Sequence, residues 1–310
     1  MSLYDFKVPE SKRVRLIIHT DCKNEADDQY AVIHQLLTPM LDVRGIIAGH
    51  FEKNNGRYPA GTSAQASFDE IVKITGLIGA AGRYPIRLGA SAALRDERTP
   101  VPAPGVELII SEAMRDDPRP LFIGMQGAIT DLASAILTEP RICGRMTAIW
   151  IGGGDYPDGG EEFNLMQDIN AANVVFSSSM PLWQVTRSVY KQFALSLAEL
   201  QVKVKPCGKI GAYLFRQLVE LNDSFADVPV WPHGETWALG DQGVIAALMQ
   251  EQQRTDNYTV LPAPNFDPVT MKYVRRQTNR DIRVYHSLDV RATLEDLFAK
   301  LRIFSDSEQP

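Results

Sequence analysis

The chain has 310 residues, of which 45% are hydrophobic and 23% charged, a composition typical of a globular protein with a sizeable core. Its formal net charge of −6 gives no electrostatic reason to expect binding to nucleic acid or to an anionic membrane. The three cysteines are far apart, the first residues lack the apolar core of a signal peptide, and no apolar run approaches the ~20 residues of a membrane span, so we expect a cytoplasmic protein.

Strand-like apolar runs alternate with helical patterns along the chain. This alternation predicts βαβ units, and therefore an α/β fold in which residues 1–310 form a single domain around a mostly parallel open sheet flanked by helices. We expect a late edge strand at 282–286 and a closing helix at 288–301. The other predicted strands are 14–19, 43–48, 120–125, 147–152 and 182–186, and the other predicted helices are 26–37, 64–75, 106–115, 130–138, 169–178 and 210–221.

An acidic turn joins the first predicted strand to the first predicted helix. Its carboxylates, Asp21, Glu25, Asp27 and Asp28, fall within eight residues. In an open α/β sheet the loop after a strand is where ligands bind, and several carboxylates together need a cation or hydrogen-bond donors to offset their repulsion. Hard divalent ions such as calcium bind oxygen ligands of this kind. Acidic residues also favour the first turn of a helix, so capping is the alternative interpretation.

The acidic turn resembles the opening motif of the nucleoside hydrolase family, Asp-x-Asp-Pro-Gly-x-Asp-Asp, in a divergent branch that reads Asn-Glu-x-Asp-Asp-Gln. Asp21, Asp27 and Asp28 match the last three carboxylates of the motif, whereas His19 stands in place of the first. The turn is two residues longer here, and residues 22–23 are Cys-Lys where Pro-Gly is usual.

Later segments match further motifs of this family in the same chain order, and together the matches run from about residue 14 to about residue 248. They include a Gly-containing loop that opens a helix, a Gly-Gly turn followed by Glu-Phe-Asn, a second helix start and a late Asp. These segments are 127–133, 152–153, 162–164, 168–172 and 240–241.

The resemblance implies a calcium-dependent hydrolase of N-glycosidic bonds in ribonucleosides or related ribosyl compounds. It implies a Ca2+ ion held by three carboxylates and one backbone carbonyl, and sugar hydroxyls held by carboxylate and amide groups. Carried over residue by residue, the calcium ligands are Asp21, Asp28, Asp241 and the carbonyl of Thr130, and the sugar-binding residues are Asp27, Glu162 and Asn164.

The residue types suit this chemistry. An N-glycosidic bond breaks through an oxocarbenium-like state, and water must then reach the anomeric carbon. A bound cation lowers the pKa of water, and a carboxylate beside it can take the proton. We assign that general base to Asp21. Carboxylates and amides that face the sugar also stabilise the developing positive charge and fix the ring.

Three departures from the family pattern concern sugar and leaving-group recognition. The family Asn expected before Glu162 is not found, and by spacing Tyr156 lies there. Gly240 replaces a family His that is often credited with helping the leaving base depart. The family Asn after the second strand is either replaced by His50, which we take as a substrate-binding candidate, or displaced to residues 54–55.

His233 and Trp231 lie in a Pro- and Gly-containing turn shortly before Asp241. His233 is a candidate for protonating the leaving group, and Trp231 for stacking on a nucleobase, because flat aromatic faces stack well. The alternatives are a structural surface His and a Trp that packs in the core.

Three functions stay open at this stage. The leading one is the calcium-dependent nucleoside hydrolase, which the resemblance implies to be a homodimer or homotetramer acting on a small nucleoside or ribosyl compound. The second is a non-catalytic, ligand-binding pseudo-enzyme on the same scaffold, motivated by Gly240 and the altered Asn positions. The third, a metal-dependent phosphohydrolase, is disfavoured because the chain has no Asp-x-Asp or phosphate-loop pattern.

Overall fold

A computed structural model of the protein describes residues 3–53, 56–232, 234–250, 254–276 and 279–308. No helix in these ranges is both long and apolar enough to cross a membrane. The strands are β1 (Val14–Thr20), β2 (Leu41–Ala48), β3 (Ile86–Leu88), β4 (Leu121–Gln126), β5 (Thr147–Ile151), β6 (Leu182–Val185), β7 (Ala194–Ser196), β8 (Thr236–Ala238), β9 (Tyr258–Pro262), β10 (Asn265–Phe266), β11 (Tyr273–Val274) and β12 (Asp281–Tyr285).

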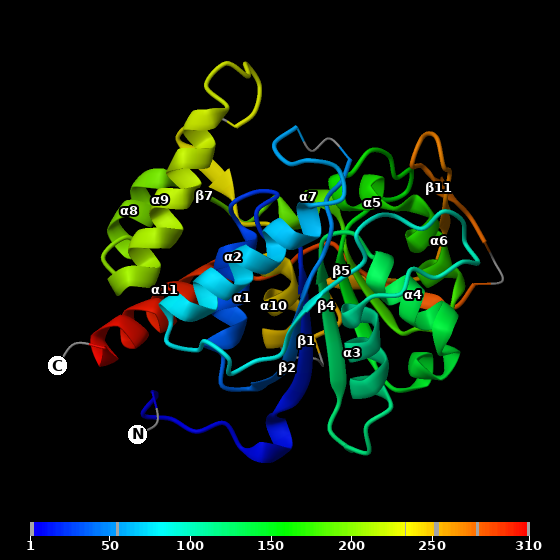
Figure 1. Ribbon diagram of the computed structural model, residues 1–310, viewed down its shortest axis with the longest axis horizontal. Helices are drawn as coiled ribbons and strands as arrows, with labels where there is room; N and C mark the ends of the chain where they lie inside the picture. Colours follow the sequence, from blue (N-terminus) through cyan, green and yellow to red (C-terminus); the bar gives the residue numbers. More distant parts are fainter. Residues whose placement is uncertain (1–2, 54–55, 233, 251–253, 277–278, 309–310) are drawn as a thin grey trace.

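The centre of the fold is an eight-stranded sheet in the order β3-β2-β1-β4-β5-β6-β12-β9. All neighbouring pairs in it are parallel except β12 and β9, which are antiparallel. The predicted architecture, a mostly parallel open sheet flanked by helices, is confirmed (Figure 1). Two small antiparallel pairs, β7 with β8 and β10 with β11, lie outside this sheet.

Helices cover both faces of the sheet because successive strand residues point to opposite sides. Leu16 and Ile18 of β1 belong to a core cluster packed under α1, α2, α9, α10 and α11. Ile17, between them, belongs to a second cluster under α3, α4 and α6. The helices are α1 (Asp28–Leu36), α2 (Ser63–Leu77), α3 (Pro104–Ala113), α4 (Thr130–Thr138), α5 (Phe163–Gln167), α6 (Ile169–Ser177), α7 (Arg187–Tyr190), α8 (Leu197–Lys203), α9 (Gly208–Ser224), α10 (Gln242–Met249) and α11 (Val290–Ser307).

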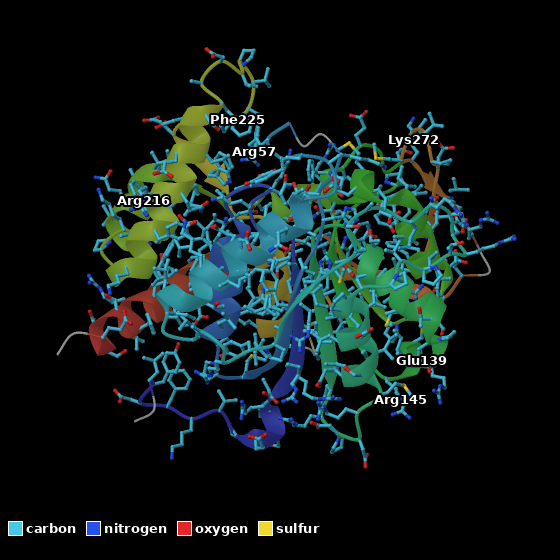
Figure 2. The ribbon with its side chains drawn as sticks, viewed as in Figure 1. Arg57, Glu139, Arg145, Arg216, Phe225 and Lys272 are labelled. Carbon is cyan, nitrogen blue, oxygen red and sulfur yellow. The ribbon has the colours of Figure 1, made fainter. Side chains whose placement is uncertain are left out.

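The strand order reverses direction between β1 and β4. From β1 the chain adds β2 and then β3 on one side, whereas β4, β5 and β6 follow on the other. Thr20 and Gln126, the last residues of β1 and β4, are paired in register, so the loops after them leave the sheet together. Ligands bind at such a switch point in open α/β sheets. In Figure 2, Arg57 and Phe225 lie in the upper part of the view, and Arg145, just before β5, lies in the lower part.

One element differs in place from its prediction. The strand predicted at 282–286 as an edge is β12, which lies between β6 and β9, so β9 is the edge strand. The composition of residues 256–280 predicts irregular structure or short strands, and β9 is one such strand, with no buried residue and with Pro262 at its end. These features are typical of an edge strand, which has one row of backbone groups exposed.

Candidate functional site

The acidic turn after β1 is a tight loop that places two carboxylates at the start of α1. Asn24 donates its backbone N–H to the carbonyl of Asp21 at 2.9 Å. Lys23 adopts a φ of 89°, in the left-handed region that favours glycine. The guanidinium of Arg57 donates to the carbonyl oxygens of Lys23, at 3.2 Å, and of Asn24. Arg57, which lies in the loop before α2, thus stabilises the strained part of the turn.

Three carboxylates from distant parts of the sequence meet above β1. Asp27 and Asp28 begin α1, and Asp241 precedes α10; one oxygen from each lies within 4.8 Å of the other two. All three are buried, with 8%, 2% and 6% of their surface exposed. Asp241 donates its backbone N–H to Oδ2 of Asp27 at 3.3 Å, and the hydroxyl of Thr20 donates to Asp28.

Asp21 lies beside this trio, and we call the four carboxylates the acidic centre. Asp21 is 2% exposed, and its Oδ2 has no hydrogen-bond partner among the described residues. Its carboxyl group lies against the backbone of Gly127, where an added Cβ would be 2.8 Å from Cγ. The site therefore brings together the end of β1, the start of α1, the loop after β4 and the start of α10.

Hydrogen bonds offset only part of the repulsion and desolvation within the acidic centre. Burial, followed by the charge of Asp27, raises the pKa of Asp28 to about 7, and burial raises the pKa of Asp27 to about 6. Burial and the neighbouring carboxylates also raise the pKa values of Asp21 and Asp241 well above the ordinary range. A dense set of buried oxygens, one of them without a partner, fits a hard divalent cation and no soft metal, because all the donors are oxygens.

Thr130, on the opposite side of the switch point, belongs to a chain of polar side chains. Asp168 caps α6 through the N–H of Ala171 at 2.9 Å and also accepts from the N–H of Leu94 at 2.7 Å. The Thr130 hydroxyl donates to Asp168 at 2.7 Å and lies 2.7 Å from Nε2 of His50. Because the Thr130 proton is directed to Asp168, Nε2 of His50 is the donor to Thr130. The buried Nδ1 of His50 then offers a lone pair that has no partner among the described residues.

Glu162 is fully engaged by hydrogen bonds. Its Oε1 accepts from the N–H of Asn164 at 3.1 Å and from the hydroxyl of Tyr190 at 2.9 Å. Its Oε2 accepts from the N–H groups of Leu165 and Gly153, both at 2.8 Å. A carboxylate has about four lone-pair sites, so Glu162 has no capacity left in this arrangement. The amide nitrogen of Asn164 donates to the carbonyl of Ile151 at 2.8 Å, which fixes that side chain beside Glu162.

The aromatic turn near residue 231 projects from the end of α9. Trp231 is 40% exposed and its ring centroid lies 5.0 Å from that of Phe225 and 5.3 Å from that of Trp237. The structure gives no contact between Trp231 and the acidic centre, and a substrate-binding role for Trp231 stays a prediction. His233 lies outside the described residues.

Tyr190 is a site residue that sequence reasoning missed. Its hydroxyl contacts Glu162, and its ring lies where a side chain at position 240 would stand, 2.9 Å from an added Cβ. The only signal in the sequence is position, because Tyr190 follows shortly after the carboxyl end of a predicted strand. Its neighbours form no motif.

Comparisons with known proteins show similarity to nucleoside hydrolases. The sequence model of the family described as "Inosine-uridine preferring nucleoside hydrolase" matches residues 16–295. An inosine-uridine preferring nucleoside hydrolase of Leishmania major is 31% identical over 119 residues, which cover 37% of this chain and 38% of that protein. The pyrimidine-specific ribonucleoside hydrolase RihA of Salmonella arizonae is 25% identical over 207 residues, 60% of this chain and 65% of that protein. These alignments therefore span less than two thirds of the relatives' own lengths.

Solved structures show the same fold over nearly the full chain. A purine-preferring ribonucleoside hydrolase from Gardnerella vaginalis superposes with a TM-score of 0.74 at 18% identity, covering 94% of this chain and 99% of that one. A plant nucleoside hydrolase superposes with a TM-score of 0.70 at 15% identity, covering 93% and 99%.

Proposed function

The chain belongs to the inosine-uridine preferring nucleoside hydrolase family, and on that premise we propose that it hydrolyses the N-glycosidic bond of ribonucleosides or related ribosyl compounds with calcium bound at the acidic centre. The observation that carries the proposal is the convergence of Asp27, Asp28 and Asp241 at the switch point of the sheet. Four buried carboxylates with raised pKa values are costly to the fold unless a ligand uses them.

The residues present fit a hard cation. Asp28 and Asp241 belong to the trio and are the ligands we propose, together with Asp21 and the backbone carbonyl of Thr130 from the family resemblance. Asp27, in the same trio, stands next to the sugar in this scheme. A bound calcium ion would offset the repulsion among these groups and lower the pKa of a nearby water.

Asp21 is the residue we assign to proton transfer. Its Oδ2 is buried and has no hydrogen bond to break before it accepts the proton of the attacking water. The remaining carboxylates stabilise positive charge on the sugar, and the unpartnered Nδ1 of His50 supports a role in accepting a hydrogen bond from a sugar hydroxyl.

A turnover assay on a panel of purine and pyrimidine ribonucleosides tests the proposal, with calcium and with chelator. We expect release of free base that depends on calcium and is lost in Asp21→Asn. The panel must hold both base classes because the similar proteins are named for different preferences. Light scattering of the same sample tests the proposed homodimer or homotetramer, and a cytoplasmic location belongs to the same proposal.

The second candidate is a ligand-binding protein without turnover. It is favoured by Gly240 in place of the family His and by the full engagement of Glu162. Calcium-dependent nucleoside binding without release of base, even from activated aryl ribosides, would establish this function and displace the hydrolase.

A further inference from the structure

The ring of Tyr190 occupies the space beside the acidic centre that a side chain at position 240 would need. A Cβ added to Gly240 would lie 2.9 Å from Cδ2 of Tyr190 and 3.5 Å from Oδ2 of Asp27. The first distance is shorter than real Cβ contacts allow. The Tyr190 ring can therefore keep this position only because residue 240 is a glycine. The second shows that position 240, which the ring contacts, lies next to a carboxylate of the acidic centre.

The hydroxyl of Tyr190 reaches the other side of the site. It donates to Oε1 of Glu162 at 2.9 Å, whereas the remaining three donors to Glu162 are backbone N–H groups. Burial, followed by the charge of Glu162, raises the pKa of Tyr190, so the phenol keeps its proton. Because that proton points to Glu162, the lone pairs of the phenol oxygen are free to accept a hydrogen bond from a ligand.

The short helix α7 fixes the position of Tyr190. The backbone N–H of Ser188 donates to Asp155 at 2.9 Å, and the guanidinium of Arg187 donates to the carbonyl of Glu161 at 2.8 Å. Both partners lie in the loop that also carries Glu162. Tyr190 is half-buried, so part of its side chain remains accessible.

We propose that Tyr190 is a specificity-determining residue that walls the site beside Gly240 and accepts a hydrogen bond from one ribosyl hydroxyl. The proposal rests on the proposed function for the class of ligand. It differs from the assignments above because Glu162 here orients Tyr190 instead of meeting the sugar alone. Because its own proton is used by Glu162, the phenol of Tyr190 can bind a hydrogen-bond donor on the ligand but not an acceptor.

A double-mutant cycle between protein and ligand tests this contact. Tyr190→Phe removes only the hydroxyl, and 2′-, 3′- and 5′-deoxynucleosides each remove one ligand hydroxyl. We expect Tyr190→Phe to lower kcat/KM about 3–10-fold for ribonucleosides, the size of one neutral hydrogen bond. For one of the three analogues we expect the variant and the wild type to be equal, because the partner is already missing.

Two further variants keep the result specific to this residue. Tyr4→Phe is the matched control, because its buried hydroxyl donates to the carbonyl of Leu37, at the end of α1 opposite the acidic centre. It should leave kcat/KM unchanged. Gly240→Ala should lower kcat/KM by pushing the Tyr190 ring aside, and the double variant Gly240→Ala, Tyr190→Ala should recover part of that loss.

The outcomes separate this proposal from the proposed function. Equal losses for Tyr190→Phe with all three analogues, in an enzyme that turns over, overturn the Tyr190 contact and leave the hydrolase intact. If wild type binds nucleosides without turnover, the same cycle is measured on Kd by calorimetry, and coupling with one analogue supports the contact while additivity overturns it. Absence of nucleoside binding overturns both. Equal melting temperatures of Tyr190→Phe and wild type show that the fold is unchanged.

Discussion

Two groups of carboxylates on either side of the switch point are held in opposite ways. Glu162 and Asp168, the capped carboxylates, each accept backbone N–H groups at a helix start together with a side-chain hydroxyl. The acidic centre has buried oxygens close together, raised pKa values and, at Asp21, an oxygen that no described residue contacts by a hydrogen bond. The capped carboxylates are satisfied by the fold alone, whereas the carboxylates of the acidic centre keep part of their mutual repulsion.

The difference separates scaffold from chemistry. Carboxylates saturated by backbone donors are rigid and pre-organised, which suits orienting a ligand or a neighbouring side chain. Carboxylates that repel one another favour proton uptake or cation binding, which suits a reaction that moves a proton. A substitution in the acidic centre and one among the capped carboxylates should therefore have different effects.

The largest effect is expected for Asp21→Asn. The amide keeps the shape of the side chain but cannot take up a proton, and loss of a positioned general base costs ~10²–10⁴-fold in kcat. Nucleoside turnover at saturating calcium measures it, with KM changing little. Asp116→Asn, at an exposed position, is the matched control. A loss smaller than tenfold would assign the proton transfer to another group.

Asp28→Ala should abolish the stabilisation that calcium gives to wild type, which is about 2.7 kcal/mol when the ion is at 100 times its Kd. Melting curves with calcium and with chelator measure this difference. Glu162→Ala is the reference from the capped group, because Glu162 contacts none of the proposed calcium ligands. It should melt at a lower temperature yet keep the calcium-dependent shift. If calcium raises the melting temperature of Asp28→Ala as much as that of wild type, the ion binds elsewhere.

The pH dependence of stability should reverse with calcium. Without metal, the folded protein binds more protons than the unfolded chain, because the pKa values of Asp27 and Asp28 are raised to about 6 and about 7. The free energy of unfolding should therefore fall as pH rises from about 4 to about 7. The fall is about 1.4 kcal/mol for each unit by which a carboxyl pKa in the folded protein exceeds its value in the unfolded chain. Urea unfolding in chelator and in calcium at pH 5 and pH 7.5 measures the change. Stability that increases over this range in chelator would contradict the raised pKa values.

The smallest effect is expected for Glu162→Gln. Its amide group cannot accept the N–H donors that one carboxylate oxygen now receives, so we expect a loss of about 1–3 kcal/mol in the free energy of unfolding. The same exchange of carboxylate for amide at Asp21 should stabilise the metal-free protein or leave it unchanged. Denaturant unfolding of both variants in chelator gives the comparison. Equal destabilisation would mean that the two groups are held alike.

Much of the fold follows from the sequence because the central strands are covered on both faces. The apolar runs at 14–19 and 147–152 predict β1 and β5 with their first residues correct and their last residues wrong by one. The helix predicted at 130–138 has the same first and last residues as α4. The short elements β3 and α7 were missed because three or four residues carry no periodicity.

Some residues of the candidate site could likewise be predicted from the sequence, and others could not. Asp28 and Asp241 stand in recognisable motifs, so their meeting was predictable from the family resemblance and the rule for strand ends. Tyr190 was not, because its role depends on a Gly at position 240 and on a carboxylate at position 162 that only the folded chain brings near it. Gly240 alone indicated a loss, whereas the structure shows what fills the space.

The meeting of Asp27 with Asp241 sets the order in which this protein can be completed during its synthesis. The two residues are 214 positions apart, so at 5–20 residues per second the ribosome needs roughly 10–40 s to go from one to the other. Over that interval β1, α1 and β2 can emerge and pack together, while three of the four carboxylates of the acidic centre lack Asp241, which precedes α10. A nascent chain should thus gain protection by calcium against proteolysis abruptly, only after α10 has left the exit tunnel.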